Sequence, residues 1–481
     1  MSAGAAVLAG TPGTDGPLLR VTNPADLSLV AAVPTASPDQ FQQAIVGARA
    51  AFDRWSRTPA TERAAHVTRL LDVLATRRDE LVDTLIDETG TPAALADRVQ
   101  VDGPLSQARQ AVGIHAALPA EEPNPVPLEE LVRGGRVAAS VLTWEPLGVV
   151  CAIPASNVPL HMALWKAVPA LLSGNTVLLR PSPLAPLAVR AVGEAAQAAG
   201  LPPGVLTVLV EEGTAGAELM TRSPLVDAVS FTGSSAVGAA ISAQAAPTLK
   251  RVLLELGGKS AGLYLPGAAD RAADGVAMVM QAMAGQGCVL QTRVLVPEAD
   301  RERVLAEVAN RVGSLRLGHP RDPETQVGPV ISAASVRRCL DHIAAAEAHG
   351  GRVVVGGRAR PDLGGHYMEP TVVALPDTAN PLAQEETFGP VVSVLGYRDV
   401  EHAIALANDT VYGLSGAVYG PPEEALAVAR RVRSGTVLVN GGYVGAYASS
   451  GGWGHSGDWR ERGREGVRAY QRARHLTALS P

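Results

Sequence analysis

Between residues 147 and 256 the sequence alternates short apolar runs with segments of helical periodicity. Runs such as 147–153 and 205–210 are apolar almost without interruption, so each predicted strand has two buried faces. Strands of this kind, separated by helices, form parallel sheets that are covered by helices on both sides. The pattern therefore predicts an α/β fold, in which ligands bind at the carboxyl ends of the strands.

The same alternation returns in a second block, from about residue 256 to residue 439. A helix is expected at 268–284, and Ser37 with Pro38 marks the start of a helical region that precedes the first block. A chain of 481 residues has room for two such units with separate cores. The apolar runs of the second block lie at 293–296, 353–355, 391–395 and 436–439.

A short excursion interrupts the α/β pattern before the first block. Residues 121–127 are rich in Pro and Glu and indicate a turn or linker, and 136–145 is predicted to be a strand that leaves the compact body. Another strand is expected near the C-terminus, around 474–476. Because a protruding strand has an unpaired edge, we expect this excursion to pair with another chain.

The composition excludes several classes of protein. The net charge of −6 gives no electrostatic footprint for nucleic acid, and no apolar run is long enough to predict a membrane span. The three cysteines form neither a disulfide framework nor a metal-binding spacing, so we predict a reducing, cytoplasmic location and no metal. Residues 1–19 lack the early positive charge and long apolar run of a secretory signal and are expected to form a frayed tail.

One cysteine lies in an unusual context. Cys288 follows Gly285 and Gly287, which open the approach to the thiol and let the backbone come close to a ligand. A free thiol with a pKa of roughly 8.5 is only slightly ionised near neutrality, so a reactive Cys288 needs a base nearby. Glu255, in the run LELGGKS at 254–260, is the candidate base. The alternative is that Cys288 is a small buried hydrophobe.

Other polar residues directly follow predicted strands. The amide of Asn157 can donate to a developing oxyanion, and Gly233 with Ser234 begins a helix at a point where phosphates commonly bind. Arg180 ends another strand, where a guanidinium can pair with a phosphate. Taken singly, these residues are equally consistent with turn chemistry, an ordinary strand–helix turn and a solvated arginine.

Together the motifs resemble those of the aldehyde dehydrogenase superfamily, over nearly the whole chain. The matching residues are Asn157, Glu255 in LELGGKS, Cys288 in GQGC, the run EETFGP at 385–390 and the run GGWGHSG at 451–457. The resemblance implies an aldehyde dehydrogenase-like α/β fold with two doubly wound parallel-sheet domains plus a small β oligomerisation arm. The implied parts are a Rossmann-like cofactor-binding domain at 1–122 and 146–254, a catalytic domain at 255–452, and the arm with the C-terminal strand at 123–145 and 453–481.

The resemblance also implies a reaction. Cys288 would attack the aldehyde carbonyl, while Asn157 and the Cys288 N–H would hold the oxyanion. Hydride would pass to a nicotinamide cofactor, and Glu255 would activate the water that hydrolyses the resulting thioester to a carboxylic acid. Lys166 matches a family lysine that is sometimes given a proton-relay role. The presence of Glu255 favours hydrolysis over transfer of the acyl group to coenzyme A.

The implied cofactor is NAD or NADP, and two departures from the family pattern bear on the choice. The family commonly has Lys at the position of Arg180 and often Glu at the position of Pro183. That Glu would bind the adenosine ribose and repel a 2′-phosphate, so its absence predicts that NADP is accepted at least comparably to NAD. The residues expected to bind the cofactor are Arg180, Ser182, Pro183, Gly233, Ser234, Gly257, Glu386 and Phe388.

The implied substrate is a small-molecule aldehyde. Ser156 stands where the family commonly has an aromatic residue, and the chain contains only 4 Phe, so we expect a roomier tunnel than an aromatic box would give. The sequence places no Arg evidently for a carboxylated substrate. The residues implied to line the tunnel are Val158, Met162, Trp165, Gly287 and Val289.

Two alternatives remain open at this point. One is an acyl-transferring or semialdehyde-specific member of the same fold, and the other is a non-catalytic binding protein that kept the fold. The intact Asn157, Glu255 and Cys288 argue against the second. The resemblance further implies a homodimer or homotetramer, and no membrane or nucleic-acid partner is predicted.

Overall fold

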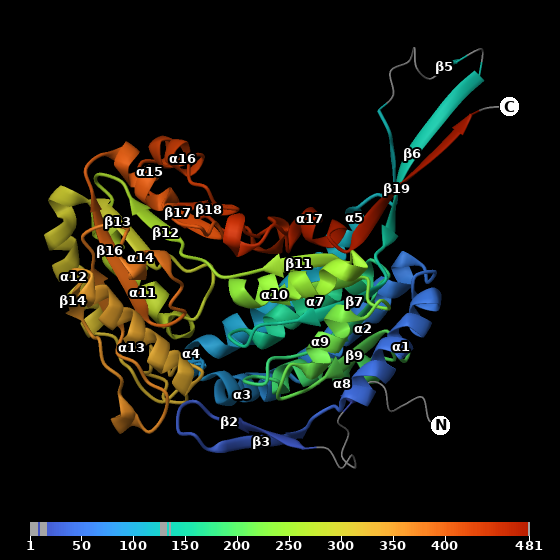
Figure 1. Cartoon of the computed structure of the whole chain (residues 1–481), viewed down its shortest axis with the longest axis horizontal. Helices are drawn as coiled ribbons and strands as arrows, with labels where there is room; N and C mark the ends of the chain where they lie inside the picture. Colours follow the sequence, from blue (N-terminus) through green and yellow to red (C-terminus); the bar gives the residue numbers. More distant parts are fainter. Residues whose placement is uncertain (1–7, 10–16, 126–131, 134–135, 480–481) are drawn as a thin grey trace.

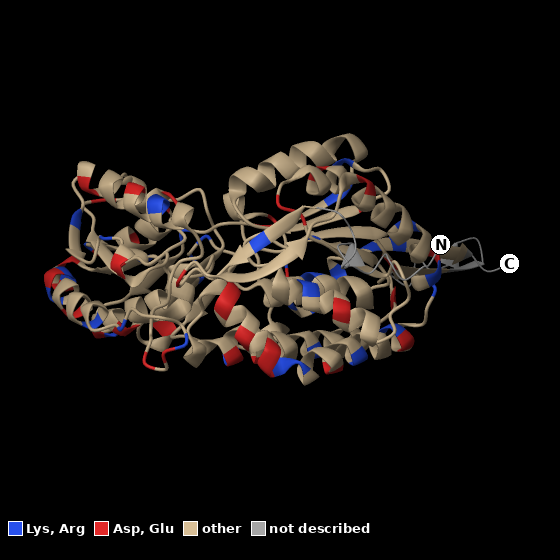
Figure 2. Ribbon diagram, turned by 90° about the horizontal axis from the view of Figure 1, so that it is seen from below, with Lys and Arg blue, Asp and Glu red and all other residues tan. Residues whose placement is uncertain are grey.

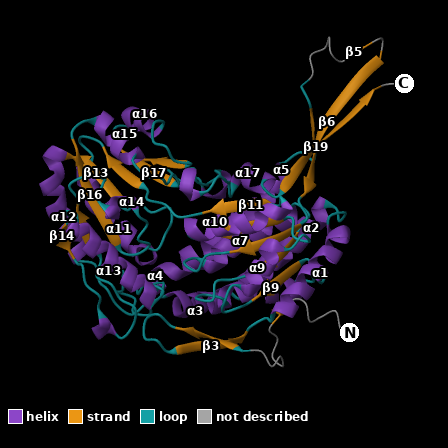
Figure 3. Cartoon of the chain, viewed as in Figure 1, coloured by secondary structure: helices purple, strands orange, loops and turns teal. Residues whose placement is uncertain are grey.

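The computed structural model describes residues 8–9, 17–125, 132–133 and 136–479. Two open sheets lie side by side, and a long β arm projects from one end of the molecule (Figure 1). Helices surround both sheets (Figure 3). The described chain is therefore an α/β protein built around two sheets, which confirms the predicted fold class.

The first sheet contains six strands, all parallel, in the order β1-β9-β8-β7-β10-β11. From β7 the chain winds first towards β9 and then, beginning with β10, in the opposite direction. A parallel sheet opens a crevice at such a reversal, outside the carboxyl ends of its strands. The strands are β1 (Leu8–Ala9), β7 (Val149–Ile153), β8 (Thr176–Leu179), β9 (Leu206–Leu209), β10 (Ala228–Thr232) and β11 (Arg251–Glu255).

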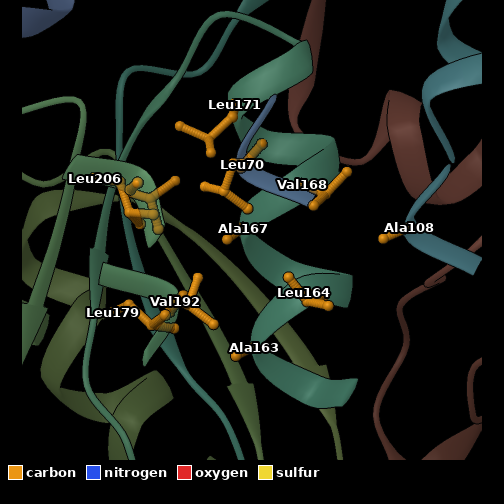
Figure 4. Packing of buried hydrophobic residues seen from close by; sticks show 14 of the residues in the cluster. Leu70, Ala108, Ala163, Leu164, Ala167, Val168, Leu171, Leu179, Val192 and Leu206 are labelled. Carbon is orange, nitrogen blue, oxygen red and sulfur yellow. The ribbon is translucent and has the colours of Figure 1, made fainter. Parts of the chain in front are cut away.

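Helices cover both faces of this sheet because alternate residues of its strands point to opposite sides. In β7, Val150 and Ala152 pack in one cluster with α2, α7 and α8, whereas Val149 and Cys151 pack in another with α1 and α9. Figure 4 shows Leu164, Ala167 and Leu171 of α7 within the first cluster. These helices and their neighbours are α1 (Pro38–Trp55), α2 (Ala60–Thr76), α3 (Arg78–Thr89), α4 (Ala93–Leu95), α5 (Gly103–Ala117), α7 (Pro159–Leu172), α8 (Leu187–Ala198), α9 (Ala215–Arg222) and α10 (Ser235–Ala245).

The predicted helix start at Ser37 is confirmed. Its hydroxyl accepts a hydrogen bond from the Gln40 backbone N–H, and the Gln40 side chain accepts one from the Ser37 N–H. This reciprocal capping box satisfies two backbone donors and is worth about 1 kcal/mol. It orients α1 so that Phe41 and Ile45 are fully buried against the first sheet.

The second sheet has the order β14-β15-β16-β13-β12-β17-β18 and is parallel except for β14. Its two central strands, β12 and β13, are entered by the segments that carry Glu255 and Cys288. The carboxyl edge of the first sheet therefore faces the segments that enter the amino edge of the second. The strands are β12 (Ala261–Tyr264), β13 (Arg293–Pro297), β14 (Arg352–Val355), β15 (Thr371–Ala374), β16 (Val391–Tyr397), β17 (Ser415–Tyr419) and β18 (Thr436–Val439).

Two clusters also sandwich the second sheet. One contains α11 and α12, and the other contains α13, α15 and α16. Arg293, at the start of β13, is fully buried and donates to the carbonyl groups of Leu406 and Ala407, which end α15. The helices are α11 (Ala272–Gln281), α12 (Arg301–Gly313), α13 (Ala333–Ala348), α14 (Pro381–Gln384), α15 (Val400–Asn408), α16 (Pro422–Ala429) and α17 (Gly463–Arg468).

The arm is formed by strands from distant parts of the sequence. β6 (Arg136–Pro146) pairs along nearly its whole length with β19 (Gln471–Leu479), antiparallel, and more briefly with β4 (Glu121–Pro123) and β5 (Val132–Arg133). The predicted excursion and C-terminal strand are thus both present and paired with each other. Of the predicted linker at 121–127, residues 126–127 lie outside the described residues.

The prediction of a frayed tail over residues 1–19 is wrong where the structure describes that segment. Leu8–Ala9 extends the first sheet, and β2 (Leu18–Thr22) forms a hairpin with β3 (Leu29–Pro34). Leu19, Val21 and Val33 of this hairpin are buried against Val210. The Ala, Gly and Pro content of the segment concealed these strands, because their stability comes from packing and strand pairing rather than from local propensity.

Charge is spread without segregation. Acidic and basic residues are interspersed over the helices (Figure 2). Among the described residues, no helix is both long and apolar enough to cross a membrane, and no cluster of His, Cys, Asp and Glu has the makings of a metal site.

Candidate active site

The Cys288 segment leaves α11 through an unusual backbone conformation. The helix ends at Gln281 rather than at 284 as predicted, because Met283, Ala284 and Gly285 have φ values of 46°, 52° and 72°. A left-handed residue cannot continue a right-handed helix. Glycine is required at 285, since a Cβ there would overlap the carbonyl oxygen of Gly389. The turn therefore seats the Cys288 segment directly on the EETFGP run.

Asn157 is held against the same segment. Its side-chain nitrogen donates to the carbonyl oxygen of Gln286 at 2.8 Å, and its backbone carbonyl accepts a hydrogen bond from the Gln100 side chain at 2.9 Å. From the other side, a Cβ at Gly258 would lie 2.7 Å from the Cys288 carbonyl oxygen, so the LELGGKS run also packs against the segment. The structure thus brings Asn157, the LELGGKS run and the Cys288 segment together.

Glu255 ends β11 and is enclosed beside these groups. Its Oε1 atom is buried and has no hydrogen-bond partner among the described residues. Burial raises the pKa of Glu255 well above its usual value, and Glu461 raises it further, while Lys166 and two arginines act in the opposite direction. Space for the carboxylate depends on Gly451, because a Cβ there would lie 2.9 Å from Oε1. A carboxylate with these properties is suited to act as a general base.

Lys166 is fully buried and forms an ion pair that the sequence did not indicate. Its ammonium donates to Glu461 at 2.8 Å and to the Ser230 hydroxyl at 3.3 Å, and Ser230 lies 3.0 Å from the Tyr470 hydroxyl. Sequence reasoning missed Glu461, which belongs to the charged run 460–462 in the Gly-rich C-terminal region. No sequence spacing relates Glu461 to Lys166. The one sequence feature that could have indicated it is a carboxylate between two arginines in a region otherwise rich in glycine.

The Cys288 thiol lies among carboxylates. Burial raises its pKa to about 12, and Glu386, Glu255 and Glu461 contribute in the same direction. The thiol therefore needs either proton transfer to a nearby base or added positive charge nearby before it can react as the thiolate. The other two cysteines, Cys151 and Cys339, are buried, and all three are free.

The carboxyl ends of the first-sheet strands carry several of the predicted cofactor residues. Ser234 is the N-cap of α10, where its exposed side chain accepts from the Val237 N–H, and Gly233 leaves room for the Phe231 ring. Thr232 and Glu255 are paired residues of β10 and β11, so this helix start lies next to the candidate base. Free backbone N–H groups at a helix start suit a pyrophosphate.

Arg180 lies at the same edge but is turned inward. Its side chain is only 9% exposed, and its Nε donates to Glu211 at 2.9 Å, while another guanidinium nitrogen donates to the Gly213 carbonyl. Glu211 also accepts from the first N–H groups of α9, which fixes the pair. Ser182 and Pro183 are half-buried beside it. The guanidinium is thus already engaged by a carboxylate instead of being free for a phosphate.

Glu386 and Phe388 lie in the EETFGP run, which contacts the LELGGKS run. A Glu386 oxygen accepts from the Gly258 N–H at 2.9 Å, and a Cβ on Gly257 would overlap the same carboxylate. Burial raises the pKa of Glu386. Phe388 is half-buried, with φ 52°. Together with the α10 N-terminus, this close glycine-lined approach fits a dinucleotide.

The predicted tunnel residues are only partly brought together. Val158, the N-cap of α7, and Met162, on that helix, are each 7% exposed. Trp165 is half-buried on the same helix, and the centre of the His161 ring lies 4.1 Å from that of Trp165, edge-on. Val289, after Cys288, is 47% exposed. The sequence did not indicate a role for Arg462 beside these residues, and its guanidinium lies 4.9 Å from the centre of the Trp165 ring.

Comparison with known proteins agrees with this geometry. The model of the aldehyde dehydrogenase family matches residues 11–476. The chain is 36% identical to a betaine aldehyde dehydrogenase of Cereibacter sphaeroides, over 96% of this chain and 94% of that protein. It is 34% identical to a 3-succinoylsemialdehyde-pyridine dehydrogenase of a Pseudomonas species, over 94% and 93%.

Solved structures give the same result. An aldehyde dehydrogenase of Mycobacterium tuberculosis, complexed with NAD+, superposes with a TM-score of 0.90 at 37% identity, covering 97% of this chain and 95% of that one. A betaine aldehyde dehydrogenase of Staphylococcus aureus, also with NAD+, superposes with a TM-score of 0.91 at 31% identity, covering 96% and 92%. The resemblance stated from the motifs is confirmed: the chain belongs to the aldehyde dehydrogenase family and is an NAD(P)-dependent enzyme of that family.

Proposed function

We propose that this enzyme oxidises an aldehyde to its carboxylic acid through covalent catalysis by Cys288. The observation that carries the proposal is the convergence of three groups from separate segments. Asn157 is bonded to the Cys288 segment, the LELGGKS run packs on the same segment, and Glu255 has an enclosed oxygen without a hydrogen-bond partner among the described residues. This is the constellation of a nucleophile, an oxyanion donor and a base.

In the first half of the reaction, the Cys288 thiol gives its proton to a nearby base, and the sulfur forms a bond to the carbonyl carbon. The π electrons of the C=O bond move to the oxygen, which gives a thiohemiacetal oxyanion. An Asn side chain has two N–H donors, of which one is used on Gln286, so a second remains for the oxyanion together with the Cys288 N–H. A nicotinamide dinucleotide supplies the hydride acceptor when bound. Loss of hydride from the carbon leaves a thioester on Cys288.

In the second half, Glu255 takes a proton from water, and the hydroxide attacks the thioester carbon. The carbon–sulfur bond breaks, the acid leaves and the thiol is restored. The Lys166–Glu461 ion pair acts on this carboxylate in two directions: the charge of Glu461 raises the pKa of Glu255, and that of Lys166 lowers it. An acyl-transferring member would instead require coenzyme A, so aldehyde oxidation measured with and without coenzyme A separates the two. A requirement for coenzyme A would overturn the hydrolytic proposal.

NADP is expected to serve at least comparably to NAD in initial-rate assays. With Arg180 bonded to Glu211, the support for NADP is the absence of a carboxylate at Pro183. Pro183→Glu should lower kcat/KM for NADP by about 10- to 100-fold, because a carboxylate there would repel a 2′-phosphate, and should maintain or raise kcat/KM for NAD, because the same carboxylate can bind the ribose hydroxyls. Glu212→Gln, on the neighbouring loop, is the matched control. A strong preference of the unaltered enzyme for NAD would contradict this prediction.

We further propose that the arm makes this enzyme a homodimer or homotetramer. β19 lies at the edge of its sheet, and residues 472–478 are exposed. A long strand with a free edge is a template for pairing with a second copy. A chain truncated after Gln471 should therefore form an assembly with fewer subunits than the full chain, as measured by size-exclusion chromatography with light scattering. An unchanged assembly mass would show that the arm is not the interface.

We also propose domain boundaries and a cellular location for this enzyme. The cofactor-binding unit corresponds to 1–122 and 146–254, the catalytic unit to 255–452, and the arm with the C-terminal strand to 123–145 and 453–481. A cytoplasmic location is proposed from the three free cysteines, which suit a reducing compartment.

A further inference from the structure

A small pocket lies beside Trp165, between α5, α7 and the C-terminal Gly-rich region. Its enclosed space is about 20 Å³, which is room for about one water molecule. Its lining is apolar, with residues such as Ile114, Leu164 and Ala446, except for Gln107 and Arg462. The pocket is too small to hold a whole substrate, but its lining shows which side chains gather beside Trp165. Its polar lining offers one positive charge and one amide, and no carboxylate.

Side-chain contacts link this pocket to the predicted substrate tunnel. Gln107 donates to the Tyr443 hydroxyl at 3.2 Å and lies 3.4 Å from the His161 ring nitrogen. His161 packs edge-on against Trp165, and the guanidinium of Arg462 lies 4.9 Å from the centre of the Trp165 ring and 6.0 Å from that of Tyr443. The guanidinium is therefore built into the aromatic wall.

The backbone of Arg462 is strained. Its φ of 62° and ψ of 176° fall in a region that is essentially reserved for glycine and costs about 1–3 kcal/mol for other residues. With this backbone conformation, the consecutive residues Glu461 and Arg462 have different surroundings. Glu461 binds Lys166 in the buried network, and Arg462 lies on Trp165. Strain of this kind indicates a residue that is held in place for a purpose.

Arg462 also differs from its neighbours in how its charge is compensated. Arg464 and Arg468 both form ion pairs with Glu122. Arg462 donates to the Ser450 hydroxyl and the Gly445 carbonyl, both neutral, and in the described part of the chain it has no ion pair with an acid. Its positive charge also acts on Glu255, where it lowers the pKa and so partly offsets the increase caused by burial.

We propose that Arg462 is a specificity-determining residue that selects aldehydes carrying a carboxylate at the end remote from the aldehyde group. This inference rests on the proposed function and names its substrate class. A guanidinium binds a carboxylate through charge-assisted, often bidentate hydrogen bonds, and two of its nitrogens keep their present partners in the protein. The methylene chain between the two functional groups would lie along the predicted tunnel residues Val158, Met162 and Trp165.

The same arrangement disfavours a cationic aldehyde. A quaternary ammonium group binds best over the face of an aromatic ring, with Trp the strongest. Here the guanidinium of Arg462 already lies over the Trp165 ring, so a second cation would meet a like charge instead of a free ring face. The enzyme is therefore inferred to act poorly on quaternary ammonium aldehydes.

The test compares three aldehydes of similar length, in which the remote end is a carboxylate, a methyl group or a trimethylammonium group. The ratio of kcat/KM for the carboxylated aldehyde to that for the neutral one is the readout, because it cancels any effect of Arg462 on Glu255. Arg462→Met should lower this ratio by about 10- to 100-fold, the loss expected for one hydrogen-bonded charge. Arg462→Lys should retain most of it, and Arg464→Met, on the same segment, should leave it unchanged.

The outcomes separate this inference from the proposed function. Failure to oxidise any of the three aldehydes would refute the proposed function. Oxidation of the neutral aldehyde with an unchanged ratio in Arg462→Met, or equal use of the trimethylammonium aldehyde, would overturn the role of Arg462 alone. If the variant does not fold, competition in the unaltered enzyme decides the question: a dicarboxylate should inhibit oxidation of the neutral aldehyde at least tenfold better than its diamide, and equal inhibition would refute the inference.

Discussion

Cys288→Ala is expected to lose aldehyde oxidation while keeping its cofactor. Removing a covalent nucleophile should lower kcat by at least about 10⁴-fold, because no thioester can form. The cofactor residues predicted at the first-sheet edge and on the EETFGP run do not depend on the thiol. Oxidation is measured from the absorbance of reduced cofactor, and NAD binding by isothermal titration calorimetry on the same preparation.

A matched cysteine provides the control for that variant. Cys151 is fully buried in β7, so Cys151→Ala removes a sulfur from the core of the first sheet and leaves the reacting groups in place. We expect it to lower stability by about 1 kcal/mol and to retain most activity. Full activity of Cys288→Ala, or loss of activity in both variants alike, would remove the basis for assigning the nucleophile.

Glu255→Gln is expected to stop the reaction after its first half. One equivalent of reduced cofactor should form in a rapid burst, followed by steady-state turnover reduced by about 10²- to 10⁴-fold, because glutamine cannot take a proton from water. Mass spectrometry should then find the acyl group on the peptide that contains Cys288. Glu465→Gln, on the exposed surface of α17, should behave like the unaltered enzyme.

The pH dependence gives an independent test of the same carboxylate. Because burial and Glu461 raise the pKa of Glu255, its ionised, basic form increases with pH through a range above the usual carboxyl value. Turnover limited by thioester hydrolysis should therefore rise with pH in the unaltered enzyme and lose this rise in Glu255→Gln. A Glu255→Gln enzyme that turns over normally without a burst would show that another group activates the water.

Local sequence patterns predicted the fold class well, since the alternation of apolar runs and helical periodicity directly encodes which faces are buried. They failed where the conformation depends on partners far away in the chain. The helix expected at 268–284 ends at Gln281 because the next residues turn to meet Gly389. The N-terminal strands were missed because their stability comes from pairing with β9 and packing on Val210.

The candidate site divides in the same way. Asn157 and Glu255 lie in local motifs at the ends of strands, and Cys288 lies in a local motif before one, so the sequence by itself determined the identity of all three. Only the tertiary structure decided which charges surround them. It paired Lys166 with Glu461, turned Arg180 towards Glu211 and laid Arg462 on Trp165. The reason is physical: a motif fixes the backbone of a few consecutive residues, whereas the partner of a long charged side chain depends on how separate segments pack.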